Sequence, residues 1–391
     1  MVVTIVVLLI LAGISLNLVL GQNGIISRAQ DARNQTVEGQ VNTEKAVNAL
    51  TDEMEDLISE NENSGNGGNS GGSQTTVENV VIPEGYYYVG GTKAKGLVIS
   101  DNVADKELDK GKENVRRDLA GNQWVWVPVE TPSSLYTTVD AGQALAGSTG
   151  VKTTKYTNTI ISGQTRGLPG STKYREPDIL TNSSYDYANY ATAGFSSLAN
   201  MEKNMKNDYE EMIASLEKYK GFYIGRYELT ENGEKTGATQ TCENGAYWYT
   251  LYKNCTTLAT GTKVKTRMIW GLQWDATCNW LASSGFDITD SSKWGNYSNN
   301  DATGHGSPQN TGFCESWKVN NIYDFAGNCW EFTQEAVYTD SRAYRGGDYS
   351  INGSSYPASY RSSFTPTARR QPQWFSPYFI FDTMRYGSDE F

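Results

Sequence analysis

The sequence predicts an α+β head that is carried on an N-terminal helix. Three observations lead to this prediction. Residues 2–20 are almost entirely apolar, residues 61–76 consist mainly of Gly, Ser and Asn, and the chain beyond them contains strand-like and helix-like apolar patterns. We therefore expect a hydrophobic helix at 1–21, a helical stalk at 22–60, a linker at 61–76 and one large domain at 77–391.

The amino-acid composition and net charge limit the kinds of molecule that the protein could bind. With 391 residues the chain is long enough for one large core with appendages. Its formal net charge is −11, so we expect no nucleic-acid partner, because nothing offsets the repulsion from phosphates. The 25 Tyr, 10 Trp and 11 Phe are typical of binding faces and extracellular proteins, although many of these rings must fill the core.

The N-terminal run at 2–20 has no charged side chain, and only Thr4, Ser15 and Asn17 interrupt it. At about 1.5 Å per residue, a helix of this length just crosses a bilayer core. The run resembles the N-terminal helix of type IV pilin-like proteins, although no basic leader precedes it and Ile5 stands where mature pilins usually carry Glu. A simple membrane anchor is the alternative, and an ordinary secretory signal peptide fits poorly.

Residues 25–60 contain no Pro and predict a helix with a narrow apolar stripe. The residues of the stripe are Val47, Leu50, Met54 and Leu57. This pattern is typical of a stalk or a weak coiled coil, through which the chain could self-associate. The linker at 61–76 cannot bury apolar area, so it should be a flexible tether.

The head is predicted to combine short strands with two helices. We expect strands at 80–89 and 123–129, and helices at 209–219 and 268–281. In the second strand Trp and Val alternate until Pro128 ends the pattern. Residues 131–207 are rich in Ser, Thr, Gly and Tyr, and we expect loops there.

Two stretches near the carboxyl end, 321–332 and 342–349, organise the head. Gly327 and Asn328 suit a backbone at positive φ, Trp330 is expected in the core, and the two glycines at 346–347 allow close packing. Taken singly, these are features of a β-turn beside a core tryptophan. Their order and spacing together resemble the formylglycine-generating enzyme (sulfatase-modifying factor) family, from residue 77 to 385 and most strongly after 321.

The resemblance implies a variant of the C-type lectin-like fold and defines where catalytic groups would lie. Copper-dependent members hold their metal with a cysteine pair just after the Gly-Gly-aromatic turn, because thiolates suit Cu(I). Here residues 348–356 contain no cysteine, and none follows Cys329. Iron-dependent relatives need several histidines, whereas this chain has only His305, which we expect in a loop. We therefore predict no catalytic residues; an oxidase with atypical site residues is the alternative.

The same resemblance implies a structural calcium site at the 327–331 turn. Carried over residue by residue, its ligands would be the carbonyls of Gly327 and Cys329 and the carboxylate of Glu331. Calcium is a hard cation that prefers oxygen ligands. The alternative is that Glu331 forms an ordinary hydrogen bond to the turn.

The chain has five cysteines, an odd number. In an exported head, Cys242 could pair with Cys255 and Cys314 with Cys329, which leaves Cys278 on its apolar helix. Sequence alone does not fix this connectivity, and the spacings do not match a zinc site.

The final segment has the composition of a binding surface, with aromatic anchors and small polar residues. The candidate ligand-binding residues are Tyr349, Asn352, Ser354, Ser355, Tyr356, Tyr360, Arg361, Trp374, Phe375 and Tyr378. The segment resembles the variable C-terminal region of retroelement-diversified proteins that share this fold. The alternative is a set of core-lining rings with polar spacers.

These observations predict a membrane-anchored or pilus-associated protein of the cell surface with an extracellular, non-catalytic head. We expect the head to bind an extracellular protein or glycan. A third hypothesis makes the chain a structural pilin-like subunit whose head decorates a fibre.

Overall fold

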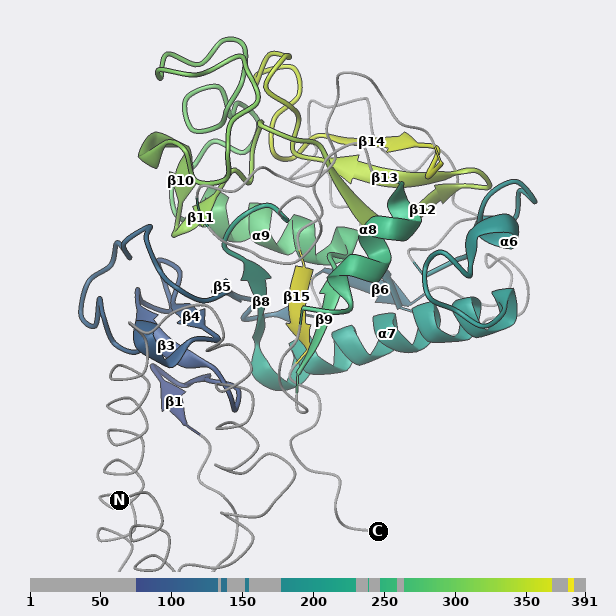
Figure 1. Ribbon diagram of the computed structural model, residues 1–391, viewed down its shortest axis with the longest axis horizontal. Coiled ribbons are helices and arrows are strands. Elements are labelled where there is room, and N and C mark those ends of the chain that lie inside the picture. Colours follow the sequence, from purple (N-terminus) through teal and green to yellow (C-terminus); the bar gives the residue numbers. More distant parts are fainter. Residues whose placement is uncertain are drawn as a thin grey trace, which may run out of the picture. The chain divides into compact units, whose positions relative to one another are not determined.

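The computed structural model describes residues 75–132, 135–138, 152–154, 177–229, 238, 247–258, 264–367 and 379–382 (Figure 1). The chain divides into two compact units, Met1–Gly72 and Ser73–Phe391. The predicted hydrophobic helix, the stalk and most of the linker lie outside the described residues. Within the described ranges, no helix combines the length and the apolar character needed to cross a bilayer.

The second unit is a mixed α/β structure built on antiparallel sheets. Its central sheet has six strands in the order β3-β4-β5-β8-β15-β9, and every neighbouring pair is antiparallel. The strands are β3 (Tyr87–Gly90), β4 (Val98–Ser100), β5 (Gln123–Pro128), β8 (Gly221–Gly225), β15 (Phe379–Asp382) and β9 (Lys265–Met268).

The interior position of β5 explains its sequence. Trp124, Val125, Trp126 and Val127 are all buried, so both faces of the sheet are covered here. The predicted strand at 123–129 is confirmed. The predicted strand at 80–89 is divided instead into β2 (Val80–Val81) and β3, because a turn intervenes in which Tyr86 N donates to Pro83 O at 3.1 Å.

Helices cover both faces of the central sheet. The helix α7 (Leu198–Tyr219) packs against β8 and β15, whereas α8 (Trp248–Cys255) and α9 (Gly271–Ser283) contact β9 and β5 (Figure 1). The predicted helix at 268–281 is confirmed from residue 271 onward, since Met268 ends β9. Shorter helical elements are η2 (Val103–Asp105), α6 (Asp186–Asn189) and η5 (Glu315–Trp317).

The helix α7 is longer than the sequence predicts. The Ser197 side chain caps its N-terminus by accepting from Asn200 N, and Lys220 ends it in the left-handed conformation, with φ 58°. The prediction of a helix at 209–219 is confirmed, but the prediction of loops before 207 is wrong from Leu198 onward. Met201 and Met205 continue the buried face of α7 toward its N-terminus by one helical turn each. The residues between them are polar, so the apolar spacing is hard to recognise in the sequence.

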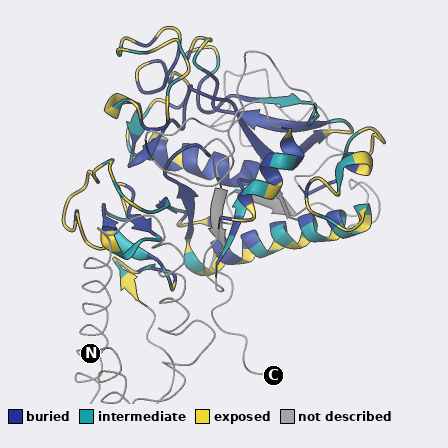
Figure 2. Ribbon diagram, in the orientation of Figure 1, coloured by how far each residue is buried: buried dark blue, intermediate teal, exposed yellow. Residues whose placement is uncertain are grey.

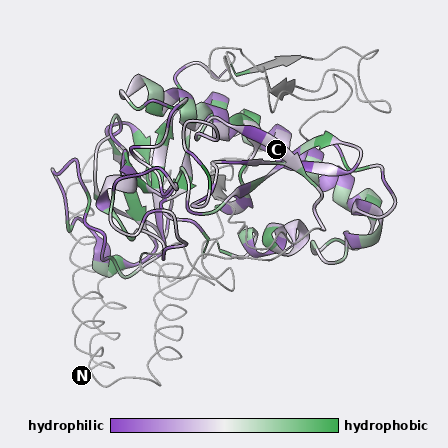
Figure 3. Cartoon of the chain, turned by 90° about the horizontal axis from the view of Figure 1, so that it is seen from above, coloured by the Kyte–Doolittle hydropathy of each residue, from purple (hydrophilic) through white to green (hydrophobic). Residues whose placement is uncertain are grey.

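A second, three-stranded sheet lies beyond α9 and consists of β12 (Glu331–Tyr338), β13 (Ser341–Arg345) and β14 (Arg361–Phe364). Each pair in it is antiparallel. Three two-stranded sheets complete the unit: β1 (Thr76–Val77) with β2, β6 (Tyr136–Thr138) with β7 (Lys152–Thr154), and β10 (Lys318–Val319) with β11 (Ile322–Tyr323). Buried residues concentrate in the two larger sheets and α9, and hydrophilic residues follow the outer loops (Figures 2 and 3).

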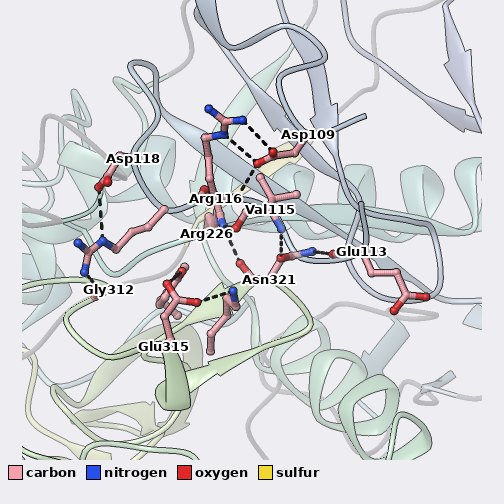
Figure 4. Close-up of polar contacts among 12 residues, drawn as sticks. Asp109, Glu113, Val115, Arg116, Asp118, Arg226, Gly312, Glu315 and Asn321 are labelled. Carbon is pink, nitrogen blue, oxygen red and sulfur yellow. Dashed lines mark hydrogen bonds and ion pairs between the residues drawn. The ribbon is translucent and has the colours of Figure 1, made fainter. Parts of the chain in front are cut away.

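Arg226 and Asn321 join three distant segments in the core (Figure 4). The buried guanidinium of Arg226 donates to the carbonyls of Asn321, Arg116 and Val115 at 3.0, 2.9 and 2.7 Å. The amide of Asn321 donates to the carbonyls of Gly96 and Glu113, both at 2.8 Å, and accepts from Val115 N at 3.0 Å. This network fixes the 96–116 segment against β8 and the β10–β11 hairpin.

We expect Asn321→Asp to destabilise the protein by roughly 3 kcal/mol or more, because a buried carboxylate would face carbonyl oxygens that now receive hydrogen bonds. The matched control is Asn320→Asp, since Asn320 also has a positive φ but is half-buried and donates only to Ser284 Oγ among the contacts described. Urea unfolding of both variants measures the difference. Equal stability of the two variants would contradict the assigned role of Asn321.

Candidate functional site

The turn at 327–331 is anchored by a buried carboxylate from the segment that follows β8. Glu228 follows β8 and is fully buried, and it accepts from the Asn328 side chain and from Cys329 N at 3.0 Å. The predicted positive φ values are confirmed, at 75° for Gly327 and 55° for Asn328. Trp330 is buried, as predicted. The sequence did not reveal that Glu228 anchors this turn, because the two lie 100 positions apart.

The adjacent glycines allow two segments to approach closely, as predicted. A Cβ on Gly346 would lie 2.3 Å from Glu331 Oε2, and one on Gly347 would lie 2.5 Å from Tyr356 O. Gly346 O accepts from Gly327 N at 2.9 Å and from the hydroxyl of Tyr297. Tyr297 is fully buried, and its hydrogen bond to Gly346 O holds the backbone at this position.

Two buried carboxylates, Glu331 and Asp348, lie beside Tyr297. Burial raises the pKa of Tyr297 well above its usual value, and the nearby negative charges of Glu331 and Asp348 raise it further. Asp348 Oδ1 accepts from the backbone and hydroxyl of Ser350 at 2.7 and 2.6 Å, while its Oδ2 is buried with no hydrogen-bond donor among the described residues. An oxygen-rich, acidic donor set of this kind fits a hard cation such as calcium. The described ranges contain no group of three or more His, Cys, Asp or Glu side chains placed to hold a metal, so backbone carbonyls would have to complete the shell.

The residues 349–356, here called the 349–356 loop, are held in place by the segment 291–299. Ser298 N donates to Ile351 O at 2.9 Å, and Ser291 N donates to Gly353 O at 3.1 Å. Gly353 N donates to Asn299 Oδ1 at 3.0 Å. Within the loop, Asn352 Oδ1 accepts from the backbone of Ser354 at 2.9 Å. The loop backbone is therefore fixed at residues 351 and 353 by hydrogen bonds to the segment 291–299.

The structure brings together five of the ten predicted ligand-binding residues on this loop. Asn352, Ser354 and Ser355 are exposed, and Tyr349 and Tyr356 are half-buried. Trp374, Phe375 and Tyr378 lie outside the described residues.

Two predicted ligand-binding residues are placed in the interior instead. Tyr360 is 4% exposed, and its ring packs 4.8 Å from the Tyr356 ring and 5.8 Å from Trp330. Arg361 is fully buried in an ion pair with Glu335. Their burial contradicts the assignment to a binding surface: Arg361 begins β14 and pairs with Arg345 of β13, and Tyr360 directly precedes this strand.

Cys314 and Cys329, which the sequence allowed to pair, are both free thiols. The sulfur of the half-buried Cys314 lies 3.0 Å from Ser316 Oγ, whereas Cys329 is fully buried in the turn that Glu228 anchors. Cys242, the expected partner of Cys255, lies outside the described residues. Cys278 is buried in α9, and this burial raises the pKa of its thiol.

His305 lies in a loop, as predicted, and is exposed. Its backbone N–H donates to Ala302 O at 3.1 Å.

Asp324 is a buried acid. Its Oδ2 accepts from Gly312 N at 2.7 Å, and its Oδ1 is buried without a hydrogen-bond donor in the described part of the chain. Burial raises the pKa of Asp324 to about 7, partly offset by the bond from Gly312 N.

Comparisons with known proteins give only weak similarities. No family model and no curated protein matches the chain. Among solved structures, Treponema denticola variable protein 1 is 15% identical, with a TM-score of 0.30 over 41% of this chain and 84% of that one. PvdO from Pseudomonas aeruginosa is 14% identical, with a TM-score of 0.31 over 42% of this chain and 81% of that one. Similarities of this size do not assign the chain to a family.

The raised pKa of Asp324 predicts that stability falls as the pH rises. The folded protein holds this proton up to about pH 7, whereas the unfolded chain releases it near the ordinary pKa of an aspartic acid, 3.8. The stabilisation is thus complete below about pH 4 and is lost as the pH rises through 7, with a slope of at most about 1.4 kcal/mol per pH unit. Asp324→Asn should flatten the stability profile between pH 4 and 7 measured by thermal unfolding.

The control for this pH dependence is Asp301→Asn, since Asp301 is exposed. The charged and titratable groups around Asp324 include Tyr227, whose pKa is raised mainly by burial and also by Asp324 and Glu315. If Asp324→Asn and Asp301→Asn show the same slope as the wild type, Asp324 is not the titrating group.

Proposed function

We propose that this chain is a cell-surface protein whose head binds an extracellular ligand through the 349–356 loop and does not catalyse a reaction. The observation that carries the proposal is the fixed backbone of this loop, which presents Asn352, Ser354 and Ser355 to solvent. Loops that display varied polar and aromatic side chains on a rigid scaffold commonly bind ligands.

The loop is suited to recognition without reaction. Residues 349–360 contain no charged side chain, and the flanking Asp348 and Arg361 are both buried. The loop therefore offers hydroxyls, amides and tyrosine rings, which form hydrogen bonds and stacking contacts, and it contains no Asp, Glu, His, Lys or Cys that could serve as a catalytic acid, base or nucleophile. Because the loop is held before the ligand arrives, binding loses little further conformational entropy.

The architecture and the site residues support a C-type lectin-like head of the formylglycine-generating enzyme type as the finer description. The supporting features are the Gly-Asn turn before a buried Trp330 and the two glycines at 346–347. An oxidase with atypical residues is the rival. Copper-dependent oxidation of a cysteine-containing peptide by the full chain would favour the rival.

The proposed attachment, self-association and class of ligand rest on the sequence alone. We propose attachment to a membrane, or to a pilus, through the helix at 1–21, with possible self-association through the stalk at 22–60. The ligand is an extracellular protein or a glycan, and nucleic acid is disfavoured by the net charge of −11. A structural pilin-like role is the remaining candidate, for which deletion of residues 2–20 should abolish filament assembly.

We further propose that a structural calcium ion supports the turn beneath the loop. The carboxylate of Glu331 and the carbonyls of Gly327 and Cys329 would hold it. The buried Oδ2 of Asp348 lies beside the same tyrosine as Glu331 and supports a cation there. Such an ion would offset the repulsion between two buried carboxylates and stiffen the backbone that carries the loop.

Ser354→Trp should weaken binding by at least about tenfold, because a bulky ring would block the exposed tip of the loop. The full chain is applied to an array of neutral and acidic oligosaccharides and to immobilised extracellular matrix proteins, and affinity for each bound probe is compared with the wild type. Ser183→Trp is the control, since Ser183 is exposed in a different segment. Binding that survives Ser354→Trp, or no binding to any probe, would contradict the proposal.

Millimolar calcium should raise the unfolding temperature of the full chain relative to EDTA. At a calcium concentration of 100 times Kd, the stabilisation is about 2.7 kcal/mol. Glu331→Gln should remove the calcium effect, whereas Glu210→Gln on the exposed face of α7 should retain it. A calcium effect that is absent in the wild type, or unchanged in Glu331→Gln, would exclude this site.

A further inference from the structure

A groove of about 840 Å³ opens on the side of α9 that faces away from the 349–356 loop. One wall is the loop at 93–95, the other is the face of α9 that carries Asn279 and Ser283, and the end of β5 closes the bottom. Trp274, on the opposite side of α9, donates to Ala358 O at 2.8 Å and so faces the three-stranded sheet instead. The groove is therefore separate from the proposed ligand-binding loop, and its volume falls in the range of small-molecule sites.

The floor of the groove is apolar and firmly held. Val129, Ala276 and Trp280 line it and are all at least nine-tenths buried. Trp280 Nε1 donates to Ala94 O at 3.1 Å and so ties the two walls together. The floor thus offers contact to an apolar group without needing to rearrange.

Four charged side chains line the groove: Glu78, Lys93, Lys95 and Glu130. The ammonium of Lys93 lies 3.0 Å from Glu130 Oε1, and the backbone N–H of Lys93 donates to Glu78 Oε2 at 2.6 Å. Two carboxylates therefore lie beside Lys93, but of these two only Glu130 pairs with its ammonium group. Lys95 stands two residues further on, where its carbonyl and that of Gly96 accept from Asn321. The ammonium of Lys95 has no carboxylate within ion-pair distance among the described residues, and Asn279 on the facing helix offers a neighbouring amide.

We propose that this groove binds a short apolar peptide with free termini. The peptide ammonium fits the carboxylates of Glu78 and Glu130, and the peptide carboxylate fits Lys95 and the Asn279 amide. The apolar side chains fit the floor formed by Val129, Ala276 and Trp280. A ligand with a single charge matches only one part of this rim, because the lining contains two lysines and two glutamates.

The test uses the tripeptide Leu-Leu-Leu and the full chain in isothermal titration calorimetry. The peptide with free termini should bind, and acetylation of its amine or amidation of its carboxyl should each weaken binding by roughly tenfold, the effect of losing about 1.4 kcal/mol. The doubly capped peptide should bind most weakly. Equal binding of the free and the doubly capped peptide, or no binding of the free peptide, would overturn the proposal.

Two substitutions on α9 locate the site. Asn279→Trp should abolish binding by filling the groove, whereas Ala282→Trp should not, since Ala282 is exposed on the same helix and does not line the groove. Equal unfolding temperatures of the two variants show that the fold is retained. Ser354→Trp should leave tripeptide binding unchanged. Loss of binding in Ser354→Trp, or full binding in Asn279→Trp, would place the peptide elsewhere and overturn the assignment.

Discussion

The buried contact between Arg226 and Asn321 is the constraint on which the head depends. A guanidinium removed from water is tolerated only when its donors are satisfied, and here they reach backbone carbonyls from separate parts of the chain and the Gln123 side chain. Asn321 repeats the pattern with its own amide. Since Asn321 immediately precedes the strand that leads into the 327–331 turn, the same network that closes the core also sets the position of the candidate site.

In the three-stranded sheet, buried arginines are likewise paired, here with carboxylates. Arg342 contacts Asp186 at 2.7 Å, Arg345 contacts Asp275 at 2.6 Å, and Arg361 pairs with Glu335. Pairs of this kind add little net stability relative to apolar packing, but a change of register would leave charges buried without partners. The pairs therefore fix which residue of each strand faces inward, and this determines which side chains reach the surface beyond β13.

Local signals explain what the sequence predicted correctly, and long-range contacts explain what it did not. The alternation of Trp and Val predicted β5, and the Gly-Asn pair predicted positive φ at 327–328, because both properties are determined by neighbouring residues. The burial of Arg361 could not be read locally, since its partner Glu335 lies on another strand. The burial of Cys329 likewise could not be read locally, because the turn that contains it is anchored by Glu228, 101 positions away.

The site differs from its surroundings in how its backbone is held. The 349–356 loop contains no strand, and its backbone is held by the segment 291–299 and by Asn328 O, which accepts from Tyr349 N at 3.2 Å. Gly353 shows how close this contact is, because a Cβ there would lie 2.7 Å from Ser292 N. The exposed side chains of Asn352, Ser354 and Ser355 are not confined by such close contacts with the interior. Surface residues of the loop can therefore change while the contacts that support its backbone remain.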